Sequence, residues 1–290
     1  MFAEEKNGNV ILDGVVDFNV EQIFECGQCF HFEKLDEMDY VTVAYGKAQR
    51  ISQVNDKVTL HNTDLSEYNS IWKKYLDMDT DYGHIKKWLI DKDERLKEAI
   101  TMTYGIRILR QEFHEMLMSF IISQNKQIPH IKQIVGNISE RFGAKAGSIN
   151  GRKYYSFPDV KALMSITEED YREMKTGFRA PYLMSAAKAL EEGLTEEKLC
   201  AGSYGEAKAE LMKIKGVGEK VANCVLLFGL GYRNAFPVDV WVKRIMEHVY
   251  FHEDTSKEKI MEFAGENFGE YGGYAQQYLF HYARMTKLPK

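Results

Sequence analysis

The stretch IKGVGEKVANCVLLFGLGYRNAFPVDVW, residues 214–241, decides the fold. Its glycine-punctuated turn lies between two segments with helical spacing of apolar residues, 203–213 and 219–230. This order predicts a helix–hairpin–helix over about 204–229. Gly216 and Gly218 would let the backbone take positive φ and approach a ligand closely. The N–H groups that begin the second helix would then form an anion site.

The glycine spacing alone leaves two interpretations open. A Walker A loop is excluded because G-x-x-x-x-G-K-[ST] is absent, and a dinucleotide fingerprint fails because Val221 stands at its third glycine position. A clamp on the DNA backbone and a plain tight turn both remain.

Lys220 is the second residue of the apolar helix. The positive end of the helix dipole and partial burial both oppose an ammonium there, so they favour the free amine that a Schiff-base nucleophile needs. Cys224 lies one turn further along the same face. Without further context, a phosphate-contacting lysine beside a core cysteine is the favoured explanation of the pair.

Asp239 follows Pro237 and Val238 in an apolar setting. It is most simply the N-cap of the next helix. A capping carboxylate close to a lysine can also stabilise positive charge that develops on a sugar ring. The ordered set of hairpin, Lys220 and Asp239 therefore indicates chemistry as well as structure.

The composition is that of a soluble globular protein of two or three packed units, with 290 residues and 44% hydrophobic residues. We expect an intracellular protein (cytoplasm with nucleoid, or nucleus) without membrane association, because the N-terminus lacks an apolar signal segment and the longest apolar run is too short to span a bilayer. The net charge of −5 argues mildly against nucleic acid. However, Lys and Arg outnumber Asp and Glu over 120–153 and 208–244, which allows a basic face.

The four cysteines predict no metal centre. Cys26 and Cys29 form an isolated C-x-x-C, no second pair completes a zinc site, and the four thiols are too scattered for a [4Fe–4S] cluster. We expect buried thiols, no metal ligand set and no cofactor.

The fold class predicted is α+β, with a small antiparallel sheet over 1–98 followed by a helical body over 99–290 whose last helices pack back towards the sheet domain. Short β-branched or aromatic runs alternate with Gly, Asp and Asn turns in the first 75 residues. From about residue 66 the period becomes helical. We predict strands within 9–18, 29–35, 40–46, 47–54 and 57–64, and helices over 84–102, 112–124, 128–143, 159–166, 167–174, 180–193, 203–214, 218–231, 240–251, 256–269 and 273–285.

The chain resembles the helix–hairpin–helix DNA glycosylases and, within them, the 8-oxoguanine DNA glycosylase family. The resemblance covers nearly the whole length. The segments on which it is based are CGQCFHF (26–32), ISQNKQIPHI (122–131), TGFRAPYL (176–183), KGVGEKVANC with FPVDVW (215–241), and YAQQYLF (274–280).

The resemblance implies a bifunctional enzyme that rotates 8-oxoguanine out of duplex DNA into a pocket between sheet domain and helices. Lys220 would attack C1′ as the base leaves, Asp239 would stabilise the cationic sugar, and β-elimination from the imine would cut the strand. The implied base-binding residues are Gly27, whose carbonyl accepts the N7–H of the oxidised base, with Cys224, Gln276 and Phe280.

The resemblance also implies DNA contacts. Asn125 would fill the gap in the duplex, Phe178 would act as a wedge, and Arg179, which would otherwise be an exposed loop arginine, would bond the orphaned cytosine. The implied partner is double-stranded DNA with 8-oxoguanine opposite cytosine, bound by a monomer. Gly216 and Gly218 would contact the backbone of that duplex. The resemblance also implies that the backbone carbonyls of the hairpin could hold a monovalent cation.

Three residues depart from the family pattern. His130 stands where many members have a second cytosine-reading arginine, which predicts weaker discrimination of the opposite base. Trp241 replaces a histidine, which weakens the case for a phosphate contact there. Lys215 replaces a hairpin proline and could add one. Two alternatives stay open: a glycosylase for another lesion, such as an alkylated base, and a non-catalytic helix–hairpin–helix DNA-binding protein.

Overall fold

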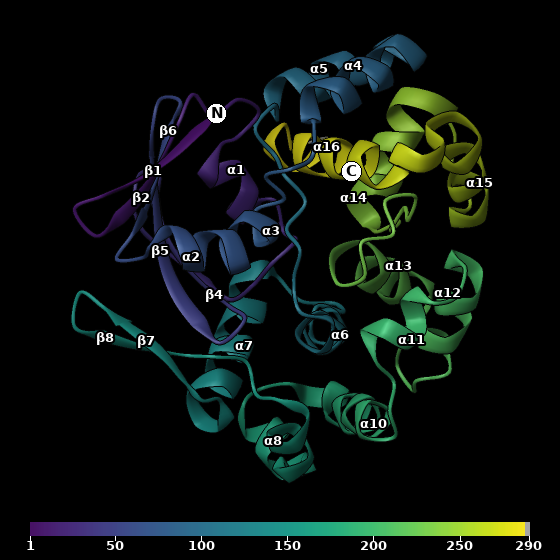
Figure 1. The fold of residues 1–290 in the computed structure, drawn as a ribbon. Helices are drawn as coiled ribbons and strands as arrows, with labels where there is room; N and C mark the ends of the chain where they lie inside the picture. Colours follow the sequence, from purple (N-terminus) through teal and green to yellow (C-terminus); the bar gives the residue numbers. More distant parts are fainter. Residues whose placement is uncertain (288–290) are drawn as a thin grey trace.

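A computed structural model describes residues 1–287 and confirms the α+β class (Figure 1). The N-terminal part is a six-stranded antiparallel sheet of order β1-β2-β6-β5-β4-β3. Side chains of its strands alternate between buried and more exposed positions, as in β5, because one face packs on the core. The strands are β1 (Phe2–Lys6), β2 (Asn9–Asp13), β3 (Phe32–Asp36), β4 (Asp39–Ala44), β5 (Lys47–Val54) and β6 (Lys57–His61).

Helices make up most of the remaining chain and surround the apolar helix α6. Asp239 is the N-cap of α14, as the sequence predicted. Pro129 lies in the first turn of α7, and Gly143 is the C-cap of that helix. The helices are α1 (Val20–Glu25), α2 (Leu65–Glu67), α3 (Lys73–Tyr75), α4 (Tyr82–Lys92), α5 (Lys97–Met102), α6 (Phe113–Ile122), α7 (Ile128–Phe142), α8 (Val160–Ser165), α9 (Glu168–Glu173), α10 (Ala180–Glu191), α11 (Glu196–Cys200), α12 (Tyr204–Met212), α13 (Glu219–Phe228), α14 (Val240–Met246), α15 (Lys257–Phe268) and α16 (Gly272–Met285).

The helix predicted over 84–102 is two helices. Asp93 takes an extended conformation with φ −149°, and its carboxylate accepts a hydrogen bond from the N–H of Arg95 at 3.0 Å. The aspartate thus ends α4 and caps the turn that leads into α5.

A small hairpin of β7 (Lys145–Ile149) and β8 (Arg152–Tyr155) was not predicted. Its Asn150–Gly151 turn has φ values of 51° and 80°, which suits a two-residue hairpin turn. The hairpin lies against the sheet, since the hydroxyl of Tyr154 donates to Glu33 at 2.8 Å.

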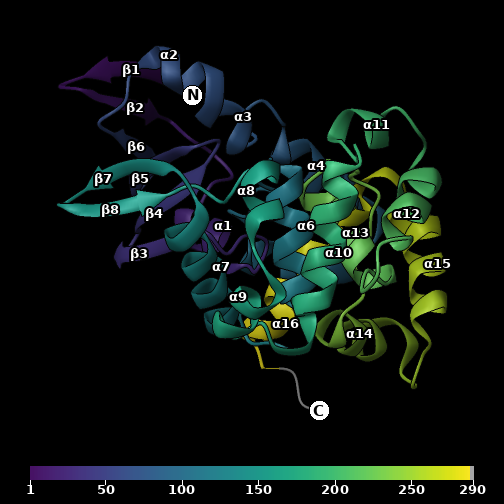
Figure 2. The ribbon, with the colours of Figure 1, turned by 90° about the horizontal axis from the view of Figure 1, so that it is seen from below.

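The last helix joins the two parts of the molecule. α16 packs against α5, and Figures 1 and 2 show it beside the sheet domain. The side chain of Gln277 donates to the carbonyl of Cys26 at 2.9 Å, and Arg284 donates to the carbonyl of Glu25 at 3.2 Å. These bonds fix the segment that follows α1, and with it Gly27, relative to the helical body. The boundary between residues 98 and 99 stays a prediction.

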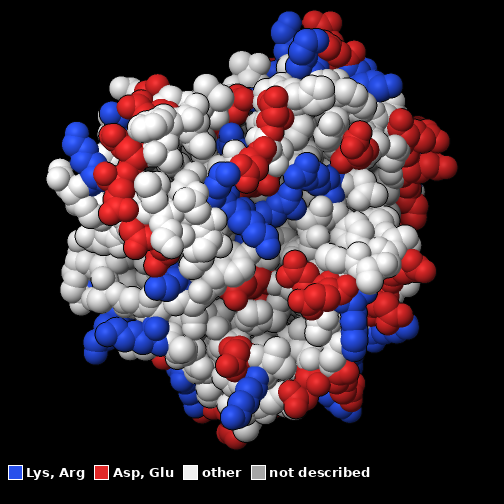
Figure 3. Space-filling model, in the orientation of Figure 1, with Lys and Arg blue, Asp and Glu red and all other residues white. Residues whose placement is uncertain are grey.

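Charge is unevenly spread over the surface. Figure 3 shows acidic side chains gathered over α15, whose exposed residues include Glu258, Glu262 and Glu266, while basic side chains gather near the centre of the same face. Within residues 1–287, none of the helices combines the length and apolar character needed to cross a membrane.

Candidate active site

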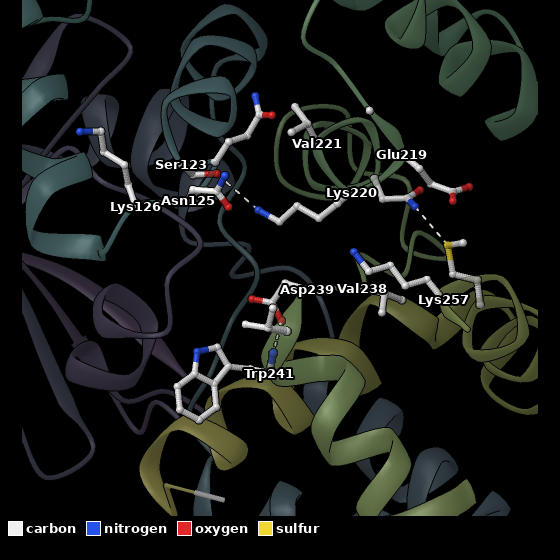
Figure 4. Close-up of a pocket in the computed structure, with 15 residues that line it drawn as sticks. Ser123, Asn125, Lys126, Glu219, Lys220, Val221, Val238, Asp239, Trp241 and Lys257 are labelled. Atoms are coloured by element: carbon white, nitrogen blue, oxygen red, sulfur yellow. Dashed lines mark hydrogen bonds between the residues drawn. The ribbon is translucent and has the colours of Figure 1, made fainter. Parts of the chain in front are cut away.

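A cavity of about 540 Å³ opens at the N-terminal end of α13 (Figure 4). Four segments far apart in the sequence form its walls: the turn after α6, the start of α13, the segment that leads into α14, and the first turns of α15. The lining residues are Ser123, Gln124, Asn125, Lys126, Gly218, Glu219, Lys220, Val221, Asn223, Val238, Asp239, Val240, Trp241, Lys257 and Met261.

Lys220 extends into this cavity from the first turn of α13 (Figure 4). Its Nζ donates a long hydrogen bond of 3.4 Å to the hydroxyl of Ser123 and lies 5.3 Å from the centre of the Phe120 ring. Among residues 1–287 it has no carboxylate within ion-pair distance. The amine is thus held loosely, with one weak partner, in a position that a ligand can reach.

Asp239 lies in the same cavity as the N-cap of α14. Its Oδ1 accepts hydrogen bonds from the N–H groups of Trp241 and Val242, both at 2.9 Å. Its Oδ2 accepts no hydrogen bond from the described residues. One oxygen therefore holds the helix terminus, and the other is available to a ligand or to a neighbouring cation.

The hairpin glycines differ from each other. Gly216 has φ +90°, and a Cβ there would lie 2.2 Å from the Tyr182 ring, so only glycine fits. The prediction of positive φ is wrong for Gly218, which caps α13 with φ −95° and has open space where a Cβ would be. Its lack of a side chain leaves room for a ligand at the helix terminus. Lys215 is exposed beside this turn.

The hairpin carbonyls are partly occupied by the chain itself. Gly216 accepts a hydrogen bond from the side chain of Gln124 at 3.0 Å, and the carbonyl of Ile214 accepts from the N–H of Val217 at 3.0 Å. A monovalent cation at this turn would share these carbonyls or use their neighbours.

Cys224 is buried one turn along α13 from Lys220. Burial raises the pKa of its thiol to about 11, although the neighbouring Lys220 acts in the opposite direction. The thiol therefore stays protonated near neutral pH and is a poor nucleophile.

Gly27 and Phe280 form a second cluster, although neither lines the cavity of Lys220. Gly27 has φ +79°, and a Cβ there would lie 3.1 Å from the Phe280 ring and 3.3 Å from Ile128. Gln276, one turn before Phe280, is buried, and its Oε1 has no hydrogen-bond partner among the described residues. A buried amide without a partner is unfavourable unless a ligand completes its bonds.

Replacing Gly27 by alanine should lower excision of 8-oxoguanine by about tenfold or more, because the added methyl group crowds Phe280. The positive φ should also cost about 1 kcal/mol of stability. Gly46→Ala is the matched control, since Gly46 has φ +74° and no atom within 4 Å of its Cβ position. Both variants should unfold at similarly lower urea concentrations. An equal loss of excision in both variants would contradict a role for Gly27 in binding the base.

Arg179 is buried, with 4% of its surface exposed, which contradicts the alternative interpretation of an exposed loop arginine. It donates to the carbonyl of Thr176 at 3.1 Å and lies 4.2 Å from the centre of the Phe178 ring, while its Nε has no partner in the described chain. Burial lowers its pKa from the usual value. Phe178 is 53% exposed and packs edge-on against Tyr182, which contacts the hairpin glycine Gly216. The exposed ring of Phe178 and the buried guanidinium of Arg179 are thus linked to the hairpin through Tyr182.

Of the other predicted DNA contacts, Asn125 and His130 are exposed and Trp241 is half-buried. Asn125 has φ 51° in the turn after α6 and lines the cavity. His130 is exposed in the first turn of α7. Trp241 lines the cavity, and the guanidinium of Arg244 lies 5.3 Å from its ring.

Sequence reasoning missed Ser123 and Lys257, which face the same cavity as Lys220. Ser123 stands at the C-cap of α6, and Lys257 begins α15. Neither belongs to a local motif with Lys220, since only the tertiary fold brings the three together. The motif segment ISQNKQIPHI contained Ser123, which was the one available signal.

A metal site would require a cluster of suitable side chains, and a redox pair would require reactive cysteines. Residues 1–287 contain no group of three or more His, Cys, Asp or Glu side chains suited to a metal ion. Cys26 and Cys29 are buried and free, and burial raises the pKa of Cys26 to about 11.

Comparison with known proteins gives two family matches. The family of the 8-oxoguanine DNA glycosylase N-terminal domain matches residues 10–117, and that of the HhH-GPD superfamily base excision DNA repair protein matches residues 118–270. The structure resembles that of Clostridium acetobutylicum 8-oxoguanine glycosylase/lyase in complex with dsDNA containing cytosine opposite to 8-oxoG, with 41% identity, 99% coverage of both chains and a TM-score of 0.96.

Two further relatives mark the range of the similarity. A probable N-glycosylase/DNA lyase of Methanothermobacter thermautotrophicus is 30% identical over 217 residues, 68% of this chain and 69% of the relative. The 3-methyladenine DNA-glycosylase of Archaeoglobus fulgidus is 25% identical, with 96% and 99% of the two chains covered and a TM-score of 0.78.

Proposed function

Because this chain belongs to the 8-oxoguanine DNA glycosylase family of the HhH-GPD superfamily, we propose that it excises 8-oxoguanine from duplex DNA and then cuts the strand, with Lys220 as the nucleophile. The observation that carries the assignment is the loosely held amine of Lys220 in one cavity with the carboxylate of Asp239. Its substrate would place it in the compartment that holds genomic DNA, the nucleoid or the nucleus.

Two side chains of this protein, Lys220 and Asp239, carry the proposed reaction. The nitrogen of Lys220 forms a bond to C1′ while the glycosidic bond breaks, and the base leaves with the electron pair and takes up a proton. The Oδ2 of Asp239, which the helix cap does not use, stabilises the positive charge on the sugar. The C1′–O4′ bond of the sugar ring then breaks, O4′ takes up a proton, and the bond between C1′ and the lysine nitrogen becomes an imine. Loss of a 2′ hydrogen from this imine expels the 3′ phosphate, which cuts the strand.

Base recognition is assigned to the cluster of Gly27, Gln276 and Phe280. Phe280 offers a ring on which an extruded base stacks, and the unpartnered Oε1 of Gln276 offers an acceptor to its Watson–Crick edge. The carbonyl of Gly27 would accept N7–H, which guanine lacks. A carbonyl facing the lone pair of guanine N7 disfavours the undamaged base.

The direct test is base release from one duplex series that varies the damaged base and its partner, under single-turnover conditions. We expect release of 8-oxoguanine to exceed that of 3-methyladenine and of guanine, with strand cleavage that follows base release. Faster release of the alkylated base would place the enzyme with the alkylated-base branch. Binding without release of any base would leave only the DNA-binding alternative.

The same series tests the opposite base. Since His130 is exposed where the family pattern has an arginine, we expect the rate opposite adenine to lie within about tenfold of the rate opposite cytosine. His130→Arg should widen this ratio by adding a guanidinium that can donate to the opposite cytosine. A strong preference for cytosine in the unmodified enzyme would show that Arg179 alone suffices.

A further inference from the structure

Lys257 is a second lysine that faces the cavity of Lys220 and has no assigned role. It is the first residue of α15, after the N-cap Ser256. Figure 4 shows its side chain extending into the same cavity as that of Lys220. No hydrogen bond or ion pair engages its ammonium within the described chain, and the positions three and four residues later, Ile260 and Met261, offer no carboxylate.

The charges around the cavity favour an anion. The ammonium groups of Lys220 and Lys257 extend into it, whereas that of Lys126 points away and donates to the carbonyl of Lys175 at 3.1 Å (Figure 4). Of the two carboxylates in the lining, Glu219 forms an ion pair with Lys208, which does not line the cavity, and Asp239 is held by backbone N–H groups through Oδ1. Two ammonium groups in one space repel each other, and a bound anion relieves that repulsion.

Lys257 is also the one cation, among the described residues, in the wall of the cavity that α14 and α15 form. Of the lining residues that α14 and α15 contribute in the described chain, Val240, Trp241 and Met261 are uncharged and Lys257 alone is positive. The other exposed charges of α15 are Glu258, Glu262 and Glu266 together with Lys259, which pairs with Glu253. Lys257 is therefore the one cation of α15 that has no carboxylate partner within the described chain and is available to DNA.

We propose that Lys257 binds a backbone phosphate of the damaged strand, at the sugar that Lys220 attacks. This inference rests on the proposed function, because that function places the extruded nucleotide in the cavity. The phosphates on both sides of a nucleotide are bonded to its own sugar, so a cavity that holds C1′ near Lys220 also receives one of them. Lys257 is thus a positioning residue, which holds the strand while Lys220 reacts.

Lys257→Gln should weaken binding of duplex DNA by about five- to tenfold and reduce the slope of log affinity against log salt concentration by about one. The single-turnover rate at saturating DNA should also fall, by about two- to fivefold, because the strand is oriented less firmly while Lys220 reacts. Lys257→Arg should restore both affinity and slope, since it keeps the charge. The probe is a duplex with a tetrahydrofuran abasic-site analogue, which binds without reacting.

Lys259→Gln is the matched control. Lys259 lies two residues further along α15, is exposed, pairs with Glu253 at 3.2 Å, and does not line the cavity. The Lys259→Gln substitution removes the same charge. Equal losses of affinity and of salt slope in both variants would mean that Lys257 contributes only to the overall positive potential, which would overturn the proposal. An unmodified enzyme that releases no base, yet shows the specific Lys257 effect on the analogue, would instead contradict the proposed function.

Discussion

Lys220→Gln should abolish the borohydride-trapped covalent complex with 8-oxoguanine duplex and lower base release by at least about a thousandfold. An amide nitrogen has no lone pair available to attack C1′, so no imine forms. Binding should stay within about threefold, because the long bond to Ser123 is the one hydrogen bond that the amine makes in the described chain. Trapping is measured by the shift of labelled DNA on a denaturing gel, and binding by titration with the same duplex.

Lys213→Gln provides the control for the lost charge. Lys213 follows α12 in the same helix–hairpin–helix, is exposed, and pairs with Glu210 at 2.5 Å. It should be trapped as efficiently as the unmodified enzyme. Efficient trapping of Lys220→Gln itself would move the nucleophile to another amine. Lys257 faces the same cavity, so a variant lacking both lysines would then identify it.

Local signals in the sequence were sufficient for the hairpin, the cap at Asp239 and the sheet apart from its edge strand β1, which was not predicted. Each depends on a few neighbouring residues whose backbone preferences agree, such as glycine at a tight turn or a carboxylate before a helix. The hairpin turn at Asn150 and Gly151 carried such a signal too, and was missed because the flanking strands are short and half exposed.

The sequence did not predict which polar side chains are buried or which distant residues they contact. Arg179 precedes Ala-Pro in a loop-like segment, yet the fold covers it with Phe178 and Thr176. Lys257 looked like one charge among many on a solvated helix, because its neighbours in the cavity come from α6, α13 and α14. Tertiary packing decides such positions, and no local pattern encodes which distant elements will meet.

Asp239→Asn should separate the structural role of this residue from its chemical one. Asparagine caps helices as well as aspartate does, and its Oδ1 can accept the same hydrogen bonds from Trp241 and Val242. The free energy of unfolding should therefore change by about 0.5 kcal/mol or less. Base release should nevertheless fall about a hundredfold, because a neutral amide replaces the Oδ2 that faces the developing cation.

Asp239→Ala completes the comparison. It removes the cap together with the charge, so it should cost about 1 kcal/mol of stability in urea unfolding while lowering base release by about as much as the asparagine variant does. Equal catalytic losses with unequal stability losses would mean that the cap serves only to hold the carboxylate. If Asp239→Asn released base at the normal rate, the carboxylate charge would be irrelevant to the reaction. Lys220 would then act with the help of the helix terminus alone, and Asp239 would be a cap like the one at Asp159 on α8.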